Sequence, residues 1–172
     1  MRTVGVLLAL AIALAVQTTL AGLRIGGGTA VNLVLVAVVY AALAFGPVTG
    51  LLAGCAGGIL QDALAGSIVG IGGIAKTLVG FLVGVLGAHF IVSQPLPRFV
   101  MFVGATVLHE ACFQALYSLA ETRAFSMNYS AVITQALVNA LVGIIAFQIV
   151  ELTPGLMQRR QARGASLSRR RY

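Results

Sequence analysis

The chain has 172 residues, of which 59% are hydrophobic and only 9% are charged, and its mean hydropathy is +1.02. Charged residues make up roughly a quarter of a soluble domain, so this composition excludes a soluble globular protein and indicates an integral membrane protein. A bilayer core about 30 Å thick needs roughly 20 apolar residues in each spanning helix. The length therefore allows about six spans with short loops and no separate soluble domain.

We expect an all-α bundle of six transmembrane helices in residues 1–152. The expected spans cover about residues 4–23, 30–45, 48–64, 69–92, 98–119 and 129–150. The first span is too long for a typical signal-peptide core of about 7 to 15 residues, although residues 19–21 could pass as a cleavage site. Gly46 and Pro47 predict a tight hinge between the second and third spans, because proline suits the first turn of a new helix.

The distribution of arginine predicts the orientation, since cytoplasmic loops carry the excess of positive charge. With six spans both termini share one side, which holds Arg2, Arg98 and six tail arginines, against Arg24 and Arg123 on the other side. Both termini are therefore predicted to be cytoplasmic, in a bacterial cytoplasmic membrane.

The basic tail, residues 153–172, lacks apolar periodicity and is predicted to be disordered. Its arginines are Arg159, Arg160, Arg163, Arg169, Arg170 and Arg171. Arginines beside a cytoplasmic membrane face attract anionic lipid headgroups, and a plain positive-inside anchor is the alternative. Nucleic acid is not expected as a partner, because the body of the chain supplies no basic surface.

Glycine recurs at every fourth position in the third and fourth expected spans. The first series is Gly50, Gly54 and Gly58, continued at the same spacing by Asp62, and the second is Gly72, Lys76, Gly80 and Gly84. Residues four apart lie on one face of a helix, so each series forms a small-residue ridge that carries one charge. Such ridges favour close helix packing over substrate contact. Val36 and Val38, in the second span, are expected to face lipid or softer packing.

Asp62 and Lys76 are predicted to lie at matching depths near the outer face, counting about 1.5 Å per residue along each helix. A charge inside the hydrocarbon costs at least about 2.5 to 3.5 kcal/mol, so a pair between the two side chains is one hypothesis. In the alternatives, Lys76 extends its long stem to the surface and Asp62 caps the end of the third span beside water.

A second polar layer lies deeper, on the fifth and sixth spans. It comprises His109, Glu110 and Asn139, together with Gln114 and Gln135. Glu110 could act as a proton-relay carboxyl, or it could be neutral and hydrogen-bonded to Asn139. We favour the second interpretation, because no further relay carboxyl accompanies it.

Catalytic or metal chemistry finds no support in the residue pattern. The dipeptide His109-Glu110 does not continue into the HExxH zinc motif. Cys55 and Cys112 lie within apolar runs, so we expect both to be core residues. The sequence therefore predicts no cofactor, no metal site and no enzymatic activity.

Three stretches carry a family resemblance: GPVTG at residues 46–50, GGILQDALAG at 57–66 and GIGGIAKTLVGFLVG at 70–84. They resemble the signature region of the MreD family, the bacterial rod shape-determining membrane proteins. The span count and the asparagine that leads the second span are similar as well. Many members open that span with a ProAsp-like pair, where this chain has Val31 and Asn32.

The resemblance implies a non-enzymatic component of the cell-wall elongation machinery, which helps to organise peptidoglycan synthesis. It implies MreC as partner, with MreB, RodA and a transpeptidase in the same complex. It also implies a fold similar to the substrate-binding membrane subunits of energy-coupling-factor vitamin transporters. The residues alone leave two classes open, a scaffold whose membrane-facing groove receives a partner helix, and a transporter subunit that binds a small molecule near Asp62 and Lys76.

The arginine distribution generates a topological prediction. Reporters fused after Val150 or within residues 93–97 should read as cytoplasmic, and a reporter within residues 26–28 should read as external. A first span cleaved from the mature protein, or a C-terminus accessible from outside the cell, would contradict the six-span arrangement.

Overall fold

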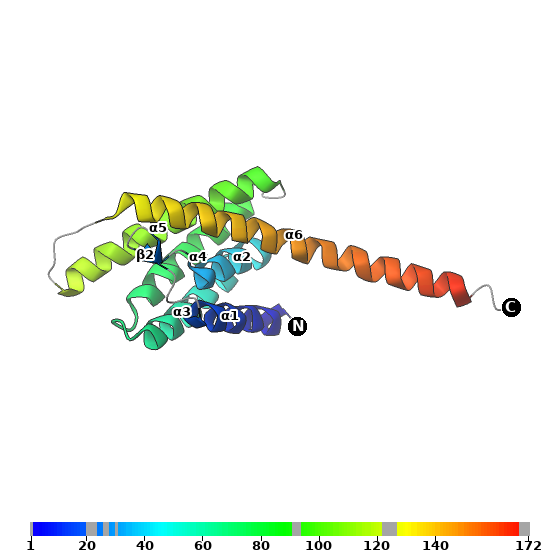
Figure 1. Cartoon of the computed structure of the whole chain (residues 1–172), viewed down its shortest axis with the longest axis horizontal. Coiled ribbons are helices and arrows are strands. Elements are labelled where there is room, and N and C mark those ends of the chain that lie inside the picture. Colours follow the sequence, from blue (N-terminus) through cyan, green and yellow to red (C-terminus); the bar gives the residue numbers. More distant parts are fainter. Residues whose placement is uncertain are drawn as a thin grey trace.

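The computed structural model describes residues 2–19, 24–25, 28–29, 31–90, 94–121 and 127–168. Its helices are α1 (Arg2–Thr19), α2 (Leu33–Phe45), α3 (Pro47–Ala65), α4 (Ile71–His89), α5 (Pro95–Glu121) and α6 (Tyr129–Ser168). Two strands of two residues each, β1 (Arg24–Ile25) and β2 (Gly28–Thr29), pair antiparallel between α1 and α2. Apart from this short hairpin the described chain is helical, which confirms the predicted fold class (Figure 1).

Four helices are long and apolar enough to cross a membrane: α3, α4, α5 and the segment Tyr129–Glu151 of α6. The apolar segments Thr3–Thr19 of α1 and Leu33–Phe45 of α2 are shorter. With 13 residues, α2 is about 20 Å long and reaches only part of the way across a core of about 30 Å. The chain is a helical membrane protein, and the count of six spans remains a prediction.

The largest difference from the expected boundaries is at the end of α6. This helix continues to Ser168, where the sequence predicted a disordered tail from residue 153. Extending an existing helix needs no new nucleation, and the Gln, Arg, Ala and Leu residues of the tail are good helix formers. Figure 1 shows the extension leaving the bundle on the side where α1 begins. Residues 169–172, with three of the tail arginines, lie outside the described residues.

Helix α2 is the centre of the bundle and contacts α1, α3, α4, α5 and α6. It is apolar on every side, as is typical of a helix in the interior of a bundle, and most of its residues are buried. The expectation that Val36 and Val38 face lipid was wrong, since their side chains are 5% and 0% exposed. An apolar helix without a polar face gives no indication of which side meets lipid.

Helices α3 and α4 approach each other so closely that their backbones touch. A Cβ atom at Gly50 would collide with the carbonyl oxygen of Gly80, and one at Gly54 with the carbonyl oxygen of Lys76. Both contacts are shorter than any that a real Cβ atom makes. The absence of side chains at these glycines therefore sets the distance between the two helices.

The same close approach continues in both directions along the pair. A Cβ atom at Gly58 would lie 2.6 Å from the Cα atom of Gly73, and one at Gly84 would collide with the Cα atom of Pro47. The two ridges thus face each other in antiparallel register. We call this contact the glycine seam; it comprises Gly50, Gly54 and Gly58 of α3 and Gly72, Gly80 and Gly84 of α4 with the backbone of Lys76 between them.

The glycine seam gives a prediction with a matched control. Gly54→Ala should lower the free energy of unfolding by about 1 to 3 kcal/mol, because the new methyl group forces the two backbones apart. Gly104→Ala, in α5, should be neutral or stabilising by up to about 1 kcal/mol, since a Cβ atom there meets nothing within 4 Å and alanine favours a helix over glycine. Unfolding of the detergent-solubilised protein measures both changes. Equal effects at the two positions would contradict the seam.

Candidate functional site: a buried polar network and a lateral groove

Asp62 joins the end of α3 to the start of α4. Its side chain is 4% exposed, and its Oδ2 atom accepts hydrogen bonds from the backbone N–H groups of Gly70 (2.9 Å), Gly72 (2.9 Å) and Gly73 (3.2 Å). The first N–H groups of a helix have no partner within the helix and carry partial positive charge, so they stabilise a carboxylate. Asp62 therefore serves as the cap of α4, although it belongs to α3.

Lys76 is 2% exposed, yet no ion pair joins it to Asp62 in the part of the chain that the structure describes. Of the hypotheses for Asp62, a helix cap agrees best with this geometry. The expected cap was at the end of α3 beside water, whereas the carboxylate is buried and caps the start of α4. Its Oδ2 atom is taken up by backbone N–H groups, which leaves less of it to offer to a small ligand.

A polar network surrounds the start of α2. The Asn32 Oδ1 atom accepts from the Leu35 N–H group (3.1 Å), and the Asn32 Nδ2 atom lies 3.4 Å from the His109 Nε2 atom. The Asn32 N–H group donates to the Asn139 Oδ1 atom (2.9 Å), and the Asn139 Nδ2 atom donates to the Thr106 Oγ1 atom (3.1 Å). This network joins α2 to α5 and α6 inside the apolar bundle.

Gln17 extends the network to α1. Its Nε2 atom donates to the Val31 carbonyl group (3.0 Å), and its Oε1 atom accepts from the Leu33 N–H group (2.7 Å). Gln17 and Thr106 were not singled out by the sequence analysis. The available signal was Asn32, because an asparagine directly before an apolar run is typical of a helix N-cap.

The predicted hydrogen bond between Glu110 and Asn139 is absent from the described structure. Glu110 instead accepts from the Gln114 Nε2 atom one turn further along α5 (3.1 Å). The reason is helical geometry: Thr106 and His109 share the buried face of α5, and the next residue is turned by about 100°. A proton-relay role for Glu110 remains an untested hypothesis.

Cys55 is exposed on α3, so the prediction that it is a core residue was wrong; Cys112 is partly buried, and both thiols are free. Cys55 follows the seam residue Gly54 and lies at the edge of the α3–α4 contact, where it lines a hollow together with Ile74 and Thr77 of α4. Across the described ranges, no group of three or more His, Cys, Asp or Glu side chains is placed to hold a metal ion.

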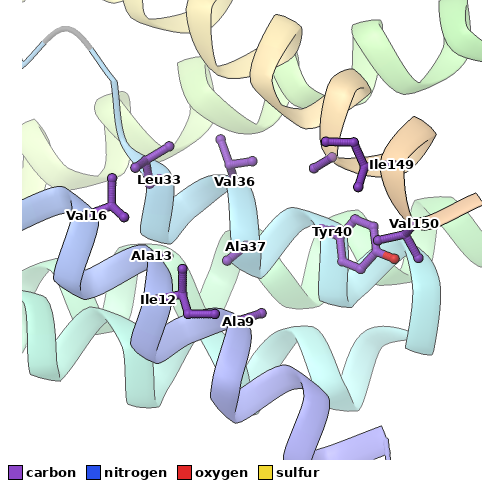
Figure 2. Close-up of a pocket in the computed structure, with 11 residues that line it drawn as sticks. Ala9, Ile12, Ala13, Val16, Leu33, Val36, Ala37, Tyr40, Ile149 and Val150 are labelled. Atoms are coloured by element: carbon purple, nitrogen blue, oxygen red, sulfur yellow. The ribbon is translucent and has the colours of Figure 1, made fainter. Parts of the chain in front are cut away.

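A lateral groove opens on the side of the bundle between α1 and α6, with α2 as its floor (Figure 2). Its volume is about 480 Å³, and its walls are almost wholly apolar. The lining residues are Ala9, Ile12, Ala13 and Val16 of α1, Leu33, Val36, Ala37 and Tyr40 of α2, and Ala146, Ile149 and Val150 of α6. The central helix is therefore left uncovered along this one strip.

The groove continues toward the end of the bundle where α1 begins. A second hollow of about 240 Å³ shares Tyr40 and Val150 with the first and reaches Gly5 and Phe45. In Figure 2 the Tyr40 hydroxyl group lies at this end, beside Val150. The sequence predicted a membrane-facing groove but not its position, because the residues that line it are as apolar as those that face lipid.

An ion pair stands next to this end of the groove. The Arg98 Nη2 atom donates to the Glu151 Oε1 atom at 2.5 Å, and the Arg98 guanidinium lies 4.4 Å from the centre of the Phe147 ring. The Phe147 ring in turn contacts the Tyr40 ring, with 4.4 Å between centroids. The ion pair is thereby connected to the floor of the groove.

The Asp62 cap gives a prediction that separates it from a direct pair with Lys76. Asp62→Ala should lower the free energy of unfolding by about 1 to 3 kcal/mol, because three N–H groups lose their acceptor at a buried position. Asp62→Asn should cost less, since its amide oxygen can still accept. Lys76→Met should not relieve the cost of Asp62→Ala. Relief in the double variant, measured by a double-mutant cycle, would show a direct pair instead.

The comparison with known families agrees with this membrane bundle. The family model for the rod shape-determining protein MreD matches residues 1–157 and so ends before the tail arginines. No curated protein and no solved structure matches the chain. The likeness to energy-coupling-factor transporter subunits accordingly stays a prediction. Because the family match covers nearly the whole of this helical membrane protein, the chain belongs to the MreD family of rod shape-determining proteins.

Proposed function

We propose that this protein is a non-enzymatic component of the cell-wall elongation complex, which maintains rod shape by binding MreC and helping to organise peptidoglycan synthesis. Its family membership supports a role in determining rod shape. The observation that carries the proposal further is the lateral groove, an apolar strip along which the most central helix is open to the side.

The groove suits a membrane helix. Within a bilayer, helices associate through close packing and not through the exclusion of water, so an open strip lined in part by small side chains is a favourable place for another helix. Ala9 and Ala13 form one wall and Ala37 lies on the floor. These short side chains allow the backbone of a partner to come close to α1 and α2.

The remaining partners follow from the binding of MreC. In this proposal MreB, RodA and a transpeptidase belong to the same complex, and the protein holds MreC among them in the cytoplasmic membrane with both of its own termini in the cytoplasm. The tail arginines add attraction to anionic lipids.

The proposal predicts that filling the groove weakens the capture of MreC. The full chain is coexpressed with MreC from the same genome, solubilised in detergent and recovered by an affinity tag. Ala13→Leu and Ala37→Leu should each reduce the recovered MreC about tenfold, since overpacking costs about 1 to 3 kcal/mol and 1.4 kcal/mol corresponds to a factor of ten.

The control is Ala56→Leu, the same change at an exposed position of α3, which should leave the recovery of MreC unchanged. Size-exclusion profiles of the variants show whether each one folds. Failure of the unaltered chain to retain MreC would overturn the proposed function. Equal losses at Ala56 and at Ala37 would place the partner elsewhere.

A further inference from the structure

The structure also indicates the polarity of the helix that the groove accepts. We infer that the end of the groove at Tyr40 and Glu151 recognises a lysine or arginine at the cytoplasmic end of a single apolar membrane helix. This inference rests on the proposed function, because it specifies the chemistry of the partner that the groove receives.

The dimensions of the groove favour a helix as the occupant. From Gly5 to Val16 its α1 wall is about 17 Å long, which is more than half of a hydrocarbon core of about 30 Å. Gly5, Ala9 and Ala13 follow each other at intervals of four along this wall. A Cβ atom at Gly5 would meet nothing within 4 Å. In the glycine seam, the same spacing of small residues brings two helices together.

The charge at this end determines which helix end belongs there. The chain has four acidic residues, and Glu151 alone lies near the end of the bundle where α1 begins, whereas Asp62, Glu110 and Glu121 lie toward the middle or the other end. The Glu151 side chain is 55% exposed. Its ion-pair partner is Arg98.

The carboxylate of Glu151 is held in place and retains a free oxygen. Arg98, whose side chain is only 10% exposed, binds the Oε1 atom and is itself packed over the Phe147 ring. Among the described residues, no hydrogen bond reaches the Oε2 atom of Glu151. Glu151 follows the groove-lining residue Val150 without lining either hollow itself, so its free oxygen is offered to a cation just past the end of the groove.

Positive charge at the cytoplasmic end is a general property of membrane helices. A helix that enters the groove in this direction brings its lysine or arginine toward Glu151, whereas Arg98 alone would repel that cation. A helix of opposite polarity brings no such charge. Glu151 therefore favours a partner helix that carries a basic residue, and it favours the orientation that places this residue at the cytoplasmic end of the groove.

Charge reversal tests the inference in the full chain coexpressed with MreC from the same genome. Glu151→Gln should reduce the recovered MreC about threefold to fivefold, because an uncharged amide attracts the cation less and an exposed ion pair is weak. Glu151→Lys should reduce it further. In a second MreC variant, the basic residues at the cytoplasmic edge of the membrane helix are changed to glutamate. The Glu151→Lys protein should recover this MreC variant well, whereas the unaltered chain should recover less of it than of unaltered MreC.

Two controls keep the outcome decisive. Thermal unfolding of Glu151→Gln shows whether the loss of the bond to Arg98 destabilises the fold, and a photo-crosslinking residue at Val150, with Leu52 on α3 as control, reports the site directly. Crosslinks from Val150 support the inference. The inference is wrong if the unaltered chain retains MreC, the two Glu151 variants retain as much of it, and no crosslink forms from Val150. The proposed function stands in that case.

If the unaltered chain retains no MreC, the proposed function is overturned, and a designed probe then tests the inference by itself. The probe is an apolar helix of about 20 residues, flanked at both ends either by lysine or by glutamate and reconstituted with the full chain in vesicles. Fluorescence energy transfer between labels on the probe and on the protein should be higher for the lysine-flanked helix than for the glutamate-flanked helix. Glu151→Lys should reverse this order. The absence of any preference would overturn the inference.

Discussion

A membrane interior supplies no water to a free backbone N–H group, and this constraint determines how α2 can begin inside the bundle. Gln17 accepts from the N–H group of Leu33. Asn139 accepts from that of Asn32, whose own side chain accepts from the N–H group of Leu35. The amide side chains of α1 and α6 thereby fix both helices around the start of α2. The groove between those two helices is a consequence of where these few amides stand.

The α3–α4 pair follows a different principle, because its contact is made by backbone and not by side chains. The glycine seam brings the two helices together, and Asp62 then satisfies the N–H groups at the start of α4. Close approach and capping support each other, since the carboxylate reaches these groups only when the seam is closed. The backbone of Lys76 takes part in the same contact, since it lies against Gly54.

The sequence predicted those features that depend on spacing along one helix. Composition indicated a helical membrane bundle, and intervals of four placed the seam glycines on single faces. Contacts between distant segments were less accessible: depth arithmetic brought Asp62 level with Lys76 but could not show that the N–H groups of α4 reach its carboxylate first. The exposure of Cys55 and the burial of Val36 were missed for one reason, because lipid-facing and core-facing residues are equally apolar.

The glycine seam has a mechanical consequence for the whole molecule. Helices in contact through their backbones have no flexible side chains between them that could rearrange, so we expect α3 and α4 to move together as one rigid unit. Helix α1 contacts only α2 and α3 among the larger contacts of the described residues, through ordinary side chains. The pair α3–α4, which carries the residues that resemble the family signature, is thus the stiffer part, and α1, as one wall of the lateral groove, can shift more easily to fit the width of a helix beside it.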